Sequence, residues 1–90
     1  MSARICTSDS LIGSLCREAA SLRAHACQIR SSAARCRDPL LLQRLTAEEG
    51  HLQRRRHAIL HTARGWERGP LRDSLALAFL IELCRRPPCP

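Results

Sequence analysis

A glutamate and a histidine stand one helical turn apart in the segment EEGH, as Glu48 and His51. This spacing puts both side chains on one side of a helix, as in the four-helix proteins that hold two iron ions between carboxylates. A full site needs a second such pair and two further carboxylates. Two copies of the chain would have to supply them, with Glu18 or Glu82 as the extra ligand. We therefore treat Glu48 and His51 as weak metal candidates and favour a solvated, charged flank.

His57 and His61 are four residues apart and share a helical face, a spacing that binds zinc when a third ligand lies nearby. No HExxH pattern accompanies them, and Arg54 and Arg64 on the same helix would repel a cation. Exposed histidines on a basic face are the favoured interpretation. No Ser/His/Asp or Cys/His motif supports a nucleophile, so we expect no enzymatic activity and no cofactor.

Six cysteines are present, and Cys16, Cys27 and Cys36 fall in one stretch with a helical pattern. Eleven residues of helix separate the first two by about 16 Å, far beyond the reach of two thiolates that each bind zinc at about 2.3 Å. The sequence has no CxxC or CxxxC spacing. Because the first ten residues lack the pattern of a secretory signal, we expect a cytoplasmic location, reduced thiols and a structural role for the cysteines.

Fifteen arginines, no lysine and eight acidic residues give the 90-residue chain a formal charge of +7 and a pI near 10.3. Such a balance favours contact with polyanions or acidic protein surfaces. The candidate polyanion face consists of Arg54, Arg55, Arg56 and Arg64. With one Trp, one Phe and no Tyr, the chain lacks the aromatic platforms of single-strand binders, and no helix-turn-helix or zinc-finger pattern is visible. Nucleic acid is therefore an alternative partner and not the favoured one.

The first predicted helix spans about 8–37. From residue 12 to residue 36, every a and d position of a heptad pattern is apolar or cysteine, and three of the four a positions are alanine. Small residues at alternate layers allow a second helix to approach closely. The predicted core positions on this helix are Ile12, Leu15, Ala19, Leu22, Ala26 and Ile29.

A second helix is predicted over about 39–64, with Asp38 as its N-cap and Pro39 at its first position. The short turn before it makes the first two helices an antiparallel hairpin. The capping-box pattern TAEE and the following Gly50 allow a break near 46–50, although one bent helix is favoured. Its predicted core positions are Leu45, Leu52 and Ile59.

A third helix is predicted over about 70–86, followed by an irregular tail at 87–90. It begins at Pro70, ends before the two prolines of RRPP, and contributes Leu75, Phe79 and Leu83 to the core. Its apolar run is half the length that a bilayer needs and contains Glu82. Apolar residues cover so much of its circumference that the hairpin alone cannot bury them, which favours a homodimer.

Together these patterns predict one all-α domain over residues 1–90. Its architecture is an antiparallel helical hairpin plus a third apolar helix, either as a three-helix unit or as a dimeric, coiled-coil-like bundle. We expect a non-enzymatic protein-protein interaction or regulatory module that self-associates and presents an arginine-rich face. The alternatives are a basic nucleic-acid-binding regulator and a metal-binding bundle using Glu48 and His51 or cysteines.

Overall fold

A computed structural model describes residues 7–69, 71 and 74–87, except the side chains of residues 7–9. Within these residues the chain forms three helices and no strand: α1 (Thr7–Arg35), α2 (Pro39–Glu67) and α3 (Leu75–Arg85). The predicted all-α fold, a hairpin with a third apolar helix, is confirmed.

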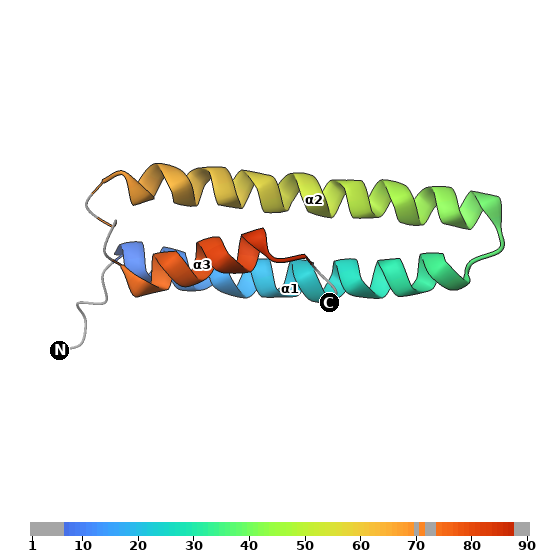
Figure 1. The fold of residues 1–90 in the computed structure, drawn as a ribbon, viewed down its shortest axis with the longest axis horizontal. Helices are drawn as coiled ribbons and strands as arrows, with labels where there is room; N and C mark the ends of the chain where they lie inside the picture. The colour runs from blue at the N-terminus through green and yellow to red at the C-terminus, as the bar shows by residue number, and fades with distance from the viewer. Residues whose placement is uncertain (1–6, 70, 72–73, 88–90) are drawn as a thin grey trace.

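The long helices α1 and α2 run antiparallel and are joined by residues 36–38 (Figure 1). Asp38 has an extended backbone, and its carboxylate accepts the N–H of Leu40 at 3.0 Å. This cap and Pro39 start α2 as the sequence predicts. The N–H of Cys36 bonds to the carbonyl of Ala33, so α1 ends at Arg35, two residues before the predicted end.

The second helix is continuous through 46–50, where the sequence allowed a break, and it ends at Glu67 instead of residue 64. A capping box would need Glu49 to turn back toward Thr46. Instead, Glu49 accepts a hydrogen bond from Arg30 of α1 at 2.6 Å. The carboxylate is thus directed across the hairpin, and the helix continues.

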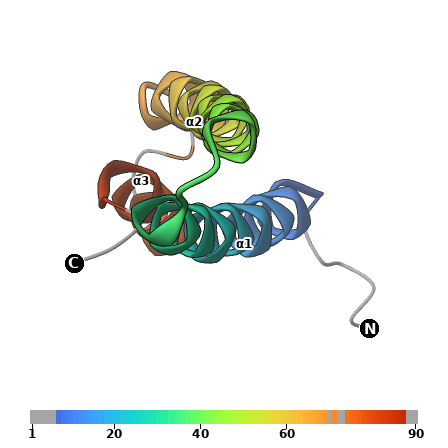
Figure 2. The ribbon, with the colours of Figure 1, turned by 90° about the vertical axis from the view of Figure 1, so that its right-hand side faces the viewer.

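The third helix lies beside α1 and below α2, and it covers only about half of the hairpin (Figures 1 and 2). It begins at Leu75, five residues later than predicted, with the Ser74 hydroxyl accepting the N–H of Leu77 at 3.2 Å. Leu71 belongs to the turn that precedes it. Pro70 and residues 88–90 of the predicted tail lie outside the described residues.

Two apolar clusters follow from this arrangement. The main cluster lies where three helices meet and contains Ile12, Ala19, Ile59, Ala63, Leu77, Leu80, Ile81 and Cys84. The second lies in the part of the hairpin that α3 does not reach and contains Ala26, Ile29 and Leu52. The described core is therefore concentrated at one end of the hairpin.

None of the three described helices combines the length and the hydropathy that a bilayer crossing requires.

Candidate functional site

The interior of the described part of the chain contains no buried polar or charged side chain. The same residues contain no group of three His, Cys, Asp or Glu side chains close enough to hold a metal ion. The polar and charged side chains that could bind a ligand or react therefore lie at the surface, and the candidate sites are surfaces.

Glu48 and His51, the predicted metal pair, face different neighbours. The Glu48 carboxylate lies 3.2 Å from Nε2 of His25 on α1, in a polar contact that bridges the hairpin. His51 lines an open hollow of about 460 Å³ between the helices, together with Glu18 and Leu22 of α1 and Leu52, Arg54 and Arg55 of α2. Both proposed extra carboxylates are engaged elsewhere, since Glu18 pairs with Arg55 and Glu82 with Arg86.

The described cysteines do not converge on a common point. Cys16 is half-buried and Cys84 buried at the main cluster, and burial raises the pKa of both thiols, so they stay protonated at neutral pH. Cys36 is a free, half-buried thiol at the hairpin turn. Cys27 is disulfide-bonded, which departs from the predicted set of reduced thiols.

The four arginines of the candidate polyanion face do not share one face. Arg55 binds the Glu18 carboxylate through two hydrogen bonds of 2.5 and 2.8 Å. Arg56 donates to Gln53 at 2.7 Å and to the carbonyl of Cys84 in α3. Two of the four are thus committed within the fold. Consecutive residues of a helix diverge by about 100°, so the run 54–56 is directed to three sides.

A different basic surface does form on α2, and we call it the outer ridge: Arg54, His57, His61, Arg64 and Arg68. All five residues are exposed. At about 100° per residue they fall within an arc of about 80°, opposite the buried Leu52, Ile59 and Ala63. His57 and His61 therefore face solvent beside arginines, and no described carboxylate or thiol completes a metal site with them. The sequence analysis missed Arg68, although the same helical spacing reaches it.

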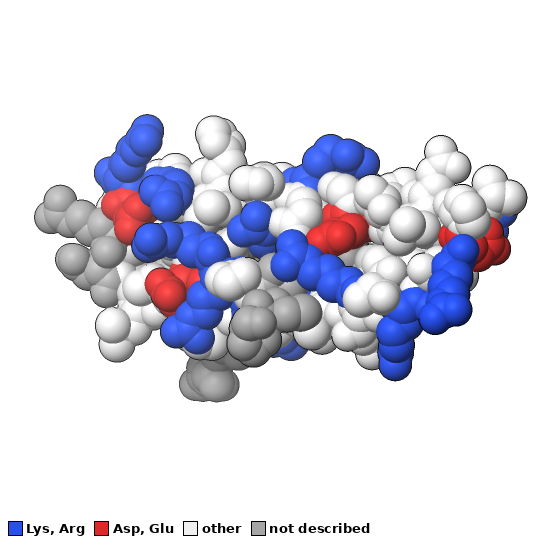
Figure 3. Space-filling model, turned by 45° about the vertical axis from the view of Figure 1, so that its right-hand side comes forward, with Lys and Arg blue, Asp and Glu red and all other residues white. Residues whose placement is uncertain are grey.

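Acidic side chains are largely neutralised by neighbours. Glu18 pairs with Arg55, Glu49 lies 2.6 Å from Arg30 and Glu82 lies 3.1 Å from Arg86, while Glu48 contacts His25. In Figure 3 the red acidic groups are few and lie beside blue arginines, whereas other arginines extend into solvent, including along the upper edge over α2. The exposed charge of this face is therefore mainly positive.

The predicted interaction core separates into three groups. Ile12, Ala19, Ala26, Ile29, Leu52 and Ile59 are buried, and Leu15, Leu22, Leu45 and Leu83 are half-buried. Leu75 and Phe79 are exposed, at 87% and 59%. The buried residues of α3 are instead Leu77, Leu80, Ile81 and Cys84. In the sequence, the signal that could have indicated this start of α3 was Ser74, which is its N-cap residue.

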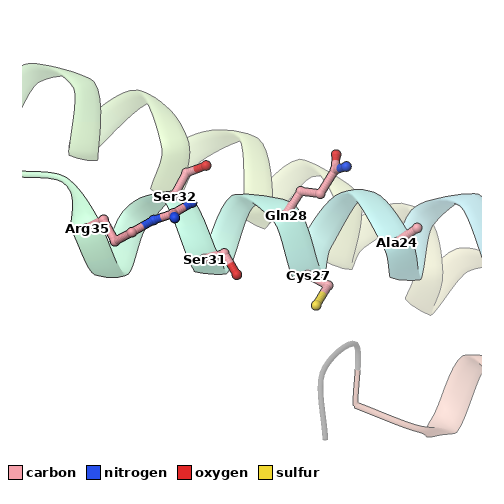
Figure 4. A pocket seen from close by; sticks show the side chains of 6 residues that line it. All are labelled: Ala24, Cys27, Gln28, Ser31, Ser32 and Arg35. Atoms are coloured by element: carbon pink, nitrogen blue, oxygen red, sulfur yellow. The ribbon is translucent and has the colours of Figure 1, made fainter.

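Another hollow, of about 600 Å³, is an open depression on α1. Its lining residues are Ala24, Cys27, Gln28, Ser31, Ser32 and Arg35. Figure 4 shows Gln28 and Cys27 pointing to opposite sides of the helix. Side chains that diverge in this way do not form a ligand site.

No known protein family matches this chain. No curated protein and no solved structure is similar to it either. The function must therefore be argued from its surfaces.

Proposed function

We propose that the chain is a non-enzymatic helical interaction module that pairs with a second copy of itself through the outer face of α3. We define this face by Leu75 and Phe79, which lie one turn apart. The supporting observation is their exposure of 87% and 59% on a helix whose opposite side is fully packed. Burial of such apolar surface is worth about 25 cal/mol per Å².

A second copy is the favoured occupant because it presents the same apolar pair, and a two-fold axis lets each pair cover the other. The overall charge of +7 opposes self-association. On the outer face of α3, however, the next charged residues are Glu82 and Arg86, which neutralise each other at 3.1 Å. The two described charges next to the apolar pair therefore add no net charge to this face.

The expected dimer is weak. Two side chains from each of two short helices bury less than the 1,200–2,000 Å² of a typical stable complex, so we expect a dissociation constant of about 1 to 100 μM. A regulatory role fits such an affinity, because assembly then responds to concentration.

Sedimentation equilibrium from about 5 to 300 μM tests the proposal across the expected range. The natural chain should form a dimer, the variant Leu75→Ser with Phe79→Ser should be monomeric, and the matched variant Leu40→Ser with Leu41→Ser should still dimerise. Leu40 and Leu41 are also exposed leucines, at the opposite end of the hairpin. A natural chain that stays monomeric over this range, with a cooperative thermal transition, would refute the proposal.

The cytosol remains our proposed compartment, and it rests on the sequence alone. The disulfide at Cys27 is the observation against it, since disulfides persist mainly in oxidising compartments. Trapping thiols in intact cells and measuring whether Cys27 is reduced decides between the cytosol and an oxidising compartment.

A further inference from the structure

We propose that the outer ridge of α2 binds the phosphate backbone of duplex nucleic acid. This surface differs from the outer face of α3, so the inference goes beyond the proposed self-association. The ridge extends over 15 residues, from Arg54 to Arg68, or about 21 Å at 1.5 Å per residue. That length matches about six phosphates along one strand, at 3.4 Å of axis each.

The position of α2 leaves the ridge open to a large ligand. Figure 2 shows α2 as a separate upper layer, with α1 and α3 side by side below it. Both neighbours pack against the side of α2 that carries the buried Leu52, Ile59 and Ala63, and Arg54 also lines the hollow between α1 and α2. A helix with its side chains is about 10–12 Å across, and the major groove of B-form DNA is about 12 Å wide. A protruding helix of this kind fits against a duplex without rearrangement of the bundle.

The arginines of the ridge have no ion-pair partner among the residues that the structure describes. No hydrogen bond or ion pair engages the guanidinium groups of Arg54, Arg64 or Arg68 in the described part of the chain. Glu48 and Glu49 are directed toward α1, and Glu67 lies about 100° around the helix from the centre of the ridge. Three guanidinium groups are thus available for phosphate contacts.

Fluorescence anisotropy with a labelled duplex DNA of about 20 base pairs tests the inference through its salt dependence. Each phosphate contact contributes about 0.9 to the slope of log affinity against log salt, so the three arginines of one bound ridge should give a slope of about 2.7.

Matched triple variants separate the ridge from net charge. Arg54→Gln, Arg64→Gln and Arg68→Gln should weaken binding at least about tenfold at 100 mM salt. Arg17→Gln, Arg35→Gln and Arg85→Gln remove the same number of charges from exposed positions elsewhere and should weaken it less than about threefold. Circular dichroism checks that each variant folds.

Two outcomes would overturn the inference. One is equal weakening by the two triple variants, which would mean that only net charge matters. The other is no binding even at about 50 mM salt, which would leave the ridge as a solvated face or a dock for an acidic protein. Sedimentation of the free chain is measured without DNA, so neither outcome bears on the proposed dimer.

Discussion

Side chains of α1 and α2 pair with each other across the hairpin. Glu18 and Arg55 do so through two hydrogen bonds, and these bonds, more than Coulomb attraction alone, lower the pKa of the Glu18 carboxyl from its ordinary value of 4.5. Both side chains are more than one third exposed. Solvent screening therefore limits such a pair to less than about 1 kcal/mol.

Glu18→Gln is expected to lower the free energy of unfolding by about 0.5 kcal/mol at pH 7. Because the pKa of Glu18 is lowered in the folded state, this contribution is present above pH 4.5 and is lost as the pH falls through the lowered value. Urea unfolding of both proteins at pH 7 and at about pH 3 measures the gap, which should close in acid. Glu67→Gln is the control, since Glu67 lies outside the ion pairs between the helices. A gap of the same size at both pH values would contradict this account.

The sequence predicts the side of a helix on which a residue lies, but not its partner across the fold. Helical geometry alone indicates that Arg54, Arg55 and Arg56 diverge. The pairing of Glu48 with His25 depends on the register between α1 and α2, and no local pattern records that register. The Glu-x-x-His spacing therefore indicates the helix correctly, but it does not indicate that Glu48 contacts His25 of α1.

The end of α3 is held by arginines from both long helices. Arg23 of α1 donates to the carbonyls of Arg86 and Pro87 at 3.0 and 2.8 Å, and Arg56 of α2 donates to the carbonyl of Cys84. The last carbonyls of a helix lack partners within it and carry partial negative charge. Arg56 supplies a donor to one of these carbonyls, that of Cys84, and Arg23 holds the two residues that directly follow α3.

Arg56→Met should lower the free energy of unfolding by about 1 to 2 kcal/mol, because it keeps most of the apolar stem but leaves a carbonyl of α3 without its donor. Arg54→Met, on the exposed outer side of the same helix, should change it by less than about 0.5 kcal/mol. Denaturant unfolding of the two variants gives the comparison. Equal effects would show that Arg56 does not anchor α3.

Helix existence was predictable here, and helix ends were less so. The heptad pattern predicts α1, and Asp38 with Pro39 predicts the start of α2. Within the continuous α2, Glu49 contacts Arg30 of α1 instead of closing a capping box, and such a tertiary contact is not visible in sequence. The sequence contains two signals that could start the third helix, Pro70 and Ser74. The helix that forms begins directly after Ser74.

At the scale of the whole molecule, the sequence predicts the hairpin and the third helix but not where along the hairpin α3 lies. That position depends on the turn before α3 and on arginine contacts between residues more than 25 positions apart. The outcome determines the candidate surfaces. The side of α2 opposite α1 and α3 is left as the outer ridge, and Leu75 and Phe79 are left outside the core.

The uneven core has a consequence for motion in the native state. Amide protons exchange with solvent through local openings, which are easiest where few buried side chains must separate. Residues 30–45 flank the small cluster of Ala26, Ile29 and Leu52, whereas residues 55–63 cross the main cluster. Hydrogen-deuterium exchange followed by mass spectrometry should therefore show residues 30–45 exchanging at least about tenfold faster than residues 55–63. Uniform protection along α2 would mean that the hairpin opens only as a whole, whereas a gradient would make its turn a hinge that moves while α3 stays in place.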